Sequence, residues 1–218
     1  NKRFDNSFTN INATNARQLR KPQLCQDEGI SFDSQMIIMG TNASCLLAEI
    51  ARRMHESGVI GQGDEIIISS ENHLANVTPW LKIARSVGAS VKWWTVTGAT
   101  TVGSKIDHHG HCGQSSCILS DLVTERTKVV AVSHVSNILG LERDISSTCD
   151  YIHRMTKGKG QVVVDGVAAA PHLLKSDATS TEQIPDWYVV SLHKLFGPHL
   201  GCLVCKRSVA QMLHPGGN

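Results

Sequence analysis

The sequence predicts an α/β fold, a doubly wound and mostly parallel sheet of seven strands with helices on both faces. Short apolar runs rich in valine and isoleucine recur along the chain, and amphipathic helical patterns separate them. Several of these runs are apolar throughout, which is typical of parallel strands buried on both faces. The expected strands are Met36–Met39, Glu65–Ser69, Val91–Val96, Val129–Ser133, Val162–Asp165, Tyr188–Ser191 and Cys202–Cys205.

Three helices are expected between these strands. Each has an apolar stripe at helical spacing, a polar residue that can cap its start and a glycine that ends it. The first follows Asn42 and ends at Gly58, the second follows Asn76 and ends at Gly88, and the third follows Asp144 and ends at Gly158. Repeated strand–helix–strand units of this kind favour right-handed crossovers between parallel strands.

The composition describes a compact globular protein and argues against several partners. The 218 residues are 41% hydrophobic and carry 21 Lys plus Arg against 19 Asp plus Glu, a net charge of +2. Because neither sign gathers into a long run, we expect no nucleic acid and no membrane surface as partner. No stretch approaches the ~18 apolar residues of a membrane span. Seven irregularly spaced cysteines indicate free thiols in a reducing compartment, the cytoplasm or an organelle matrix.

The chain divides into three segments. Residues 1–35 are polar, rich in asparagine and weakly periodic, so an irregular N-terminal segment is expected there. Residues 36–210 carry the strand and helix patterns and form the expected domain, within which residues 97–116 are expected to be a long surface loop. Residues 211–218 are expected to begin a linker to a further domain.

The expected loop holds the densest group of metal-capable side chains, His108, His109, His111 and Cys112. A zinc site needs paired ligands at a spacing that lets the chain fold back on itself, and one short patch does not offer this. We therefore expect a solvated loop here and no metal.

Polar residues follow four of the expected strands, at the edge where parallel sheets bind ligands. Gly40–Ser44 is a turn of small and hydroxylic residues whose amides could hold a phosphate, although such residues are also ordinary helix caps. Asp165 ends the run VVVD, where it needs a cationic partner or serves as a cap. Lys194 follows the run WYVVSL by one histidine and is either a solvated lysine or, if desolvated, a nucleophilic amine.

A phosphate cradle, a carboxylate and a lysine at one edge of a sheet are the three groups that pyridoxal 5′-phosphate requires. The cradle binds the phosphate, the carboxylate keeps the pyridine nitrogen protonated, and the lysine binds the aldehyde carbon. We therefore expect this cofactor at the carboxyl ends of the strands.

Four segments resemble a known family. SLHKLFGPHLGCLVCKR and VVVDGVAAAPH are similar to the lysine and aspartate segments of class V aminotransferase-type, fold type I pyridoxal-phosphate enzymes. ENHLANVTPWLKIARSVGASVKWW and KVVAVSHVSNILG resemble segments of cysteine desulfurases and their relatives. The resemblance runs in order from Met36 to Arg207 and implies that residues 36–210 are the large, cofactor-binding domain of such an enzyme.

The resemblance implies a role for each matching residue. Lys194 would bind the cofactor covalently, and His73 would stack on the cofactor ring; both would act in catalysis. Asp165 would pair with the pyridine nitrogen, and Asn137 would lie near the phenolic oxygen. The phosphate would be held by the backbone of Ala43 and by Ser44, Ser191 and His193.

Three departures from the family pattern bear on function. Ala168 stands where relatives have a Gln or His that contacts the phenolic oxygen, and Ala43-Ser44 replaces a pair of threonines in the phosphate turn. In the family a small domain supplies a substrate-binding arginine and, in desulfurases, a loop cysteine, and both are expected beyond residue 218. The 218 residues alone are therefore expected to be inactive in sulfur transfer.

The resemblance implies a cysteine desulfurase-like enzyme that converts L-cysteine to alanine and an enzyme-bound persulfide. It also implies a homodimer, an amino-acid substrate and a sulfur-acceptor protein as partner. Two alternatives stay open: another class V pyridoxal-phosphate enzyme, a lyase or epimerase acting at carbon, and a truncated relative without catalytic activity.

Overall fold

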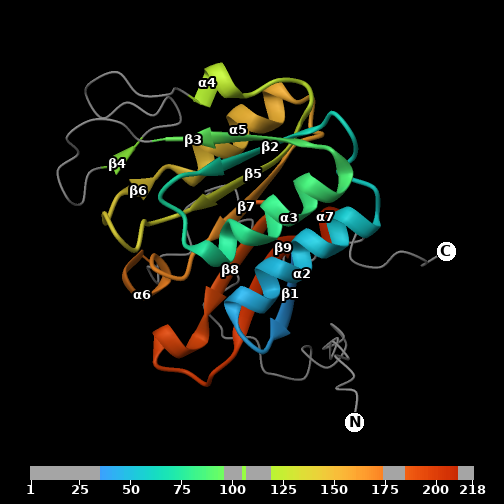
Figure 1. Cartoon of the computed structure of the whole chain (residues 1–218). Helices are drawn as coiled ribbons and strands as arrows, with labels where there is room; N and C mark the ends of the chain where they lie inside the picture. Colours follow the sequence, from blue (N-terminus) through green and yellow to red (C-terminus); the bar gives the residue numbers. More distant parts are fainter. Residues whose placement is uncertain (1–34, 96–104, 107–118, 174–184, 211–218) are drawn as a thin grey trace, which may run out of the picture.

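The computed structural model describes residues 35–95, 105–106, 119–173 and 185–210 (Figure 1). Residues 1–34 and 211–218, for which the sequence predicts an irregular segment and a linker, lie outside the described residues. So does the histidine-rich patch at 108–112. Among the described residues, no helix has both the length and the apolar character needed to cross a membrane.

A seven-stranded sheet forms the centre of the fold, in the order β1-β9-β8-β7-β5-β2-β3. Strand β9 is antiparallel to both of its neighbours, and every other pairing in this sheet is parallel. The predicted fold class, a mostly parallel doubly wound sheet, is confirmed. Its strands are β1 (Gln35–Gly40), β2 (Glu65–Ser69), β3 (Ser90–Trp94), β5 (Thr127–Ser133), β7 (Gln161–Asp165), β8 (Trp187–Ser191) and β9 (Gly201–Lys206).

Helices cover both faces of the sheet, as Figure 1 shows. The apolar stripes of α2 (Ala43–Glu56) and α3 (Thr78–Val87) pack with α7 (Arg207–Ala210) against one set of inward-facing strand side chains. On the other face, α5 (Ile145–Met155) and α4 (Leu119–Leu122) pack against the alternate set. Because both faces are buried, β2 and β7 are buried at every residue, which explains their continuous apolar runs.

Several short elements follow the carboxyl ends of the strands. They are the 3-10 helices η3 (Leu74–Asn76) after β2 and η4 (Leu192–Leu195) after β8, the helix α6 (Ala170–Leu173) after β7, and β6 (Glu142–Arg143) after β5, which pairs in parallel with β4 (Lys105–Ile106). None of them is long enough to produce a hydrophobic period, so the sequence does not predict them.

Two of the three expected helix caps are confirmed. The Asn42 side chain accepts from the Cys45 amide at 2.8 Å, and the Asp144 side chain accepts from the Ser147 amide at 2.9 Å. The predicted cap at Asn76 is wrong, because α3 begins after Val77 without a side-chain cap. Strand β3 also ends at Trp94, two residues before the expected Val96.

Asn76 is fully buried and turns toward the sheet instead of capping α3. Its Nδ2 donates to the Val132 carbonyl at 3.1 Å, and its Oδ1 accepts from the Trp80 indole at 3.1 Å. A buried carbonyl at a strand end needs a donor, and the side chain of Asn76 supplies one.

Asp186 lies directly before β8, at the amino-end edge of the sheet. Its carboxylate is buried and lies 2.8 Å from the His153 imidazole, 2.8 Å from the Val162 amide and 3.0 Å from the Lys206 ammonium. Burial acts to raise the pKa of Asp186, but the hydrogen bonds and the Lys206 charge outweigh it, so the pKa lies below its ordinary value. The carboxylate is therefore a fully partnered structural anion.

Asp186→Asn keeps the size of the side chain and removes its charge. We expect the free energy of unfolding to fall by about 2–3 kcal/mol at pH 7, since hydrogen bonds to a charged group contribute about this much. Because the folded-state pKa is lowered, the native carboxylate stabilises the fold above its ordinary pKa of about 4 and loses this effect as the pH falls through the folded-state value. Urea unfolding at pH 7 and pH 3 measures both effects, and an equal difference at the two pH values would contradict this role.

Candidate functional site

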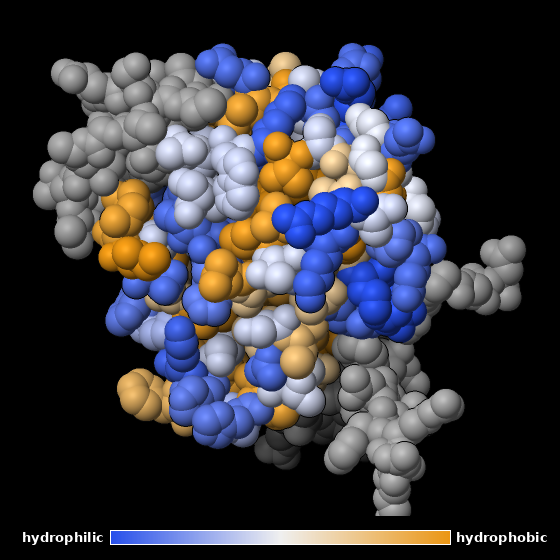
Figure 2. Space-filling model, viewed as in Figure 1, coloured by the Kyte–Doolittle hydropathy of each residue, from blue (hydrophilic) through white to orange (hydrophobic). Residues whose placement is uncertain are grey.

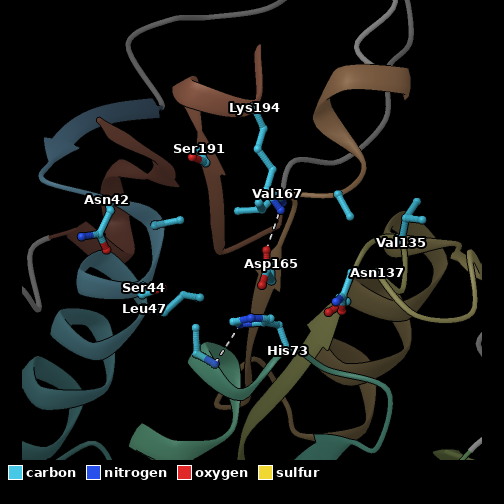
Figure 3. A pocket seen from close by; sticks show the side chains of 14 residues that line it. Asn42, Ser44, Leu47, His73, Val135, Asn137, Asp165, Val167, Ser191 and Lys194 are labelled. Atoms are coloured by element: carbon cyan, nitrogen blue, oxygen red, sulfur yellow. Dashed lines mark hydrogen bonds between the residues drawn. The ribbon is translucent and has the colours of Figure 1, made fainter. Parts of the chain in front are cut away.

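A cavity of about 270 Å³ opens at the carboxyl ends of β5, β7 and β8, between the turn before α2 and the segment after β2 (Figure 3). Polar side chains reach it from five separate parts of the chain. Of the residues that the sequence predicts for a cofactor site, the cavity lining includes Ala43, Ser44, His73, Asn137, Asp165, Ser191 and Lys194. His193 does not line it.

Asp165 is the most buried charged group of the cavity, with 7% of its surface exposed. Its Oδ1 accepts from the Val167 amide at 3.0 Å, and no described residue donates to Oδ2. Burial raises the pKa of Asp165, and the Val167 hydrogen bond and the nearby His73 and Lys194 offset this only in part. A carboxylate in this setting is stabilised by any cationic N–H group that enters the cavity.

Gly166 allows the chain to turn directly after Asp165. A Cβ at this position would lie 2.3 Å from the Tyr188 ring, so the close approach of this ring requires glycine. The Tyr188 hydroxyl lies 2.8 Å from Nδ1 of His134, and the His134 amide donates to the Asp165 carbonyl at 3.0 Å. The position of the carboxylate is therefore set by two neighbouring strands, β5 and β8.

His73 faces Asp165 across the cavity in Figure 3. It precedes η3, and its Nδ1 accepts from the Ala75 amide at 3.1 Å. Because Nδ1 is the acceptor of this hydrogen bond, Nε2 is the ring nitrogen left to donate. The ring thus offers a flat apolar face together with a single N–H donor.

Two buried asparagines on either side of His73 hold its segment on the sheet. Asn72 donates to the Ala131 carbonyl at 2.8 Å and accepts from the Ser133 hydroxyl at 3.0 Å. Asn76 reaches the Val132 carbonyl, one residue further along β5. The sequence pattern does not predict the role of Asn72 and predicts the wrong role for Asn76; the signal for both is the pair of amide side chains that flank His73 in ENHLAN.

The turn before α2 provides free backbone amides. Amides of the first turn of a helix have no acceptor within the helix, and Asn42 satisfies only that of Cys45. Strand β9 approaches this turn closely, since a Cβ at Gly201 would lie 2.5 Å from the Asn42 carbonyl carbon and 2.7 Å from the Ala43 nitrogen. Together with the Ser44 and Ser191 side chains in the lining, this turn suits an anion such as a phosphate.

Lys194 lies in η4 and extends from the opposite side of the cavity toward Asp165 (Figure 3). Its neighbour His193 is exposed, and the His193 ring stacks on His199 with centroids 3.9 Å apart and planes inclined by 22°. Lys194 and His193 therefore lie next to each other in the sequence, but only the lysine reaches the cavity.

The donor set fits pyridoxal 5′-phosphate. An amine, a buried carboxylate, a flat imidazole and a helix N-terminus match the aldehyde, pyridine nitrogen, ring and phosphate of that molecule. Ala168 lines the cavity without a polar side-chain atom, so Asn137 is the nearby amide available to an oxygen on the ring. Among the described residues no group of three or more His, Cys, Asp or Glu side chains could hold a metal ion.

Comparison with known proteins identifies the family. The model of the family described as "Aminotransferase class-V" matches residues 28–218 of the chain. The chain belongs to the class-V aminotransferase family.

Several curated relatives are similar to the chain. The aminotransferase-like protein FGM3 of Gibberella zeae is 30% identical over 183 residues, which is 84% of this chain and 40% of the relative. The cysteine desulfurase-like protein ustD of Aspergillus flavus is 32% identical over 171 residues, 78% of this chain and 36% of the relative. A probable cysteine desulfurase of Halalkalibacterium halodurans is 31% identical over 158 residues, 72% of this chain and 34% of the relative. The chain thus spans well under half the length of these class-V relatives.

Solved structures share the fold. The cysteine desulfurase CsdA of Escherichia coli aligns with a TM-score of 0.65 at 25% identity, over 84% of this chain and 41% of that one. A mutant of the protein C-DES, with glycine covalently linked to its PLP cofactor, aligns with a TM-score of 0.59 at 19% identity, over 82% of this chain and 43% of that one. The observed fold is therefore shared with a part of each of these solved structures.

Asp165→Asn is expected to affect stability in the opposite direction to Asp186→Asn. Because the folded-state pKa of Asp165 is raised, its contribution to stability is present at acid pH and is lost as the pH rises through the folded-state pKa. A neutral amide at this position should raise the free energy of unfolding of the cofactor-free chain at pH 7. Urea unfolding of the two variants side by side measures this, and a loss of stability in Asp165→Asn would refute the raised pKa.

Proposed function

We propose that the chain is the cofactor-binding domain of a pyridoxal 5′-phosphate-dependent cysteine desulfurase-like enzyme. The observation that carries the proposal is the convergence of Lys194, Asp165 and the Ser44 turn on one cavity at the carboxyl ends of the strands. Membership of the class-V family and the desulfurase relatives support it. The C-DES mutant supports pyridoxal 5′-phosphate as the cofactor.

Each residue acts according to its position in the cavity. The Lys194 amine would hold the cofactor through its aldehyde carbon and, when free, would move protons at the substrate carbon. The Asp165 carboxylate would keep a proton on the pyridine nitrogen of bound cofactor, and the protonated ring would supply an electron sink. The Ser44 turn and Ser191 hold the phosphate, and His73 covers one face of the ring.

His193 is the exception among the predicted phosphate ligands. Its ring lies outside the cavity lining and is stacked on His199. We therefore propose the Ser44 turn and Ser191 as the main phosphate contacts of this chain, with His193 contributing after a rotation of its side chain.

The proposed reaction breaks the C–S bond of L-cysteine. The sulfur passes to an acceptor thiol, which is oxidised to a persulfide, while the substrate β-carbon is reduced to the methyl group of alanine. None of the cysteines that the structure describes lines the cavity. The acceptor thiol is therefore proposed to come from elsewhere in the full protein or from a sulfur-acceptor partner.

Exposed apolar side chains around the cavity support a homodimer with the site near its interface. Leu74 in η3, Ile138 and Leu139 after β5, and Phe196 and Leu200 after η4 are all exposed. Figure 2 shows apolar groups at two of these places, at the left edge beside the β5–β6 connection and at the lower left beside η4. Large exposed apolar groups around one opening are typical of surfaces that another protein covers.

A lyase or epimerase reaction at carbon is the second candidate. Ala168 favours it, because alanine makes no polar contact with the phenolic oxygen of the cofactor. The electronic environment of the cofactor would therefore differ from that in desulfurases. Incubation of the full-length gene product with L-cysteine separates the two candidates. A desulfurase forms alanine and a persulfide, whereas a lyase forms pyruvate and sulfide, and an epimerase forms D-cysteine.

A titration with pyridoxal 5′-phosphate tests the proposal directly. We expect a new visible absorbance band, the signature of lysine-bound pyridoxal phosphate, in the native chain and its loss in Lys194→Ala. Lys206→Ala, at the opposite edge of the sheet, is the control for nonspecific reaction of a lysine. The proposal is wrong if the native chain shows no band or if Lys194→Ala keeps the band. A folded native chain that binds no cofactor would indicate a relative without catalytic activity.

A further inference from the structure

Among the described residues, Arg143 is the largest charged side chain that is fully buried, with 2% of its surface exposed. It lies at the end of β6, outside the cavity lining. Its guanidinium pairs with the Glu71 carboxylate, donates to the Ser69 hydroxyl at 2.8 Å and stacks 3.7 Å above the centre of the Trp94 ring. Nε and Nη1 have no acceptor among the described residues, so the Glu71 pair is the main compensation for burying this charge.

The contacts of Arg143 join two parts of the site. Ser69 and Glu71 belong to the stretch that leads from β2 to His73. On the other side, the Arg143 amide donates to the His134 carbonyl at 2.8 Å, and the His134 amide donates to the Asp165 carbonyl at 3.0 Å. Arg143 therefore connects the His73 segment to the strand end that carries Asp165.

We infer that the Glu71–Arg143 ion pair is a positioning pair that sets the His73 segment relative to Asp165. Neither residue lines the cavity, so neither touches a molecule bound there. A buried ion pair is seldom needed for stability, since neutral side chains of similar size often replace it without loss. Its better-attested use is to select one arrangement of the chain among several. Here the selected arrangement sets the distance from the His73 ring to the Asp165 carboxylate.

The inference rests on the proposed function only in part, because one of its consequences is measurable without cofactor. The Ala75 amide donates to His73 Nδ1 and the Asn76 amide donates to the His73 carbonyl at 2.8 Å. Hydrogen exchange at these two amides therefore reports on the His73 segment in the cofactor-free chain. The second consequence is the induced circular dichroism of bound pyridoxal 5′-phosphate, which depends on how the ring is held.

The test compares two double variants that each remove one ion pair from β2 or its continuation. Glu71→Gln with Arg143→Met removes the proposed positioning pair. Glu65→Gln with Lys92→Met removes the pair at the amino end of the same strand, where Glu65 is also buried and lies 2.7 Å from Lys92. Arg143→Lys keeps the charge but lacks the planar guanidinium that stacks on Trp94 while its Nη2 reaches Ser69 and Glu71.

We expect Glu71→Gln/Arg143→Met to exchange the Ala75 and Asn76 amides about tenfold faster and to bind pyridoxal 5′-phosphate about tenfold more weakly, with a reduced circular dichroism per bound cofactor. The Glu65→Gln/Lys92→Met control should match the native chain in exchange rate, cofactor affinity and circular dichroism. Arg143→Lys should give values between those of the native chain and those of Glu71→Gln/Arg143→Met. If the double variant does not fold, Arg143→Lys decides the question by itself.

Native exchange rates in a folded variant of the Glu71–Arg143 pair would overturn the inference, and so would native affinity together with native circular dichroism. A chain that binds no cofactor in any form, yet shows the faster exchange, would instead refute the proposed function and leave the positioning pair supported.

Discussion

Burying the Asp165 carboxylate at the end of β7 costs free energy, because only the Val167 amide donates to it among the described residues. The parallel sheet places it there: β7 is central, and its neighbours β5 and β8 close in on both sides. The rest of the site follows from this group. A ring nitrogen that enters the cavity gains a strong partner, and the segments carrying His73, Asn137 and Lys194 surround the same point.

Asp165 has fewer partners than the acids buried at the amino edge of the sheet. At the amino edge, Asp186 and Glu65 are each surrounded by donors, and Glu65 contacts Lys92, Arg126 and Thr124 at 2.7, 3.0 and 2.7 Å. At the carboxyl edge, Asp165 has a single backbone partner. Partnered acids stabilise the fold, whereas an acid with unused acceptors stabilises whatever binds to it. The direction of the pKa change, lowered at Asp186 and raised at Asp165, expresses this contrast.

The sequence predicts the strands well because burial on both faces leaves continuous apolar runs, and it predicts two caps because Asn42 and Asp144 have only local partners. Asn76 could not be assigned in this way, since its Nδ2 donates to the carbonyls of Val132 in β5 and Val163 in β7, more than fifty residues away along the chain. Arg143 and Glu71 were missed for the same reason, as they are 72 residues apart in sequence. His193 resembles a cavity residue in sequence, but a 3-10 turn directs neighbouring side chains in different directions, so only Lys194 reaches the cavity.

Covalent trapping tests the central claim, that this cavity holds pyridoxal 5′-phosphate through Lys194, most directly. The full chain is incubated with the cofactor, reduced with borohydride, digested, and the modified peptide is identified by mass spectrometry. The account predicts one dominant phosphopyridoxyl label, on Lys194, and its suppression by excess inorganic phosphate that competes at the Ser44 turn. A label distributed over surface lysines, or a dominant label on another lysine, would contradict it.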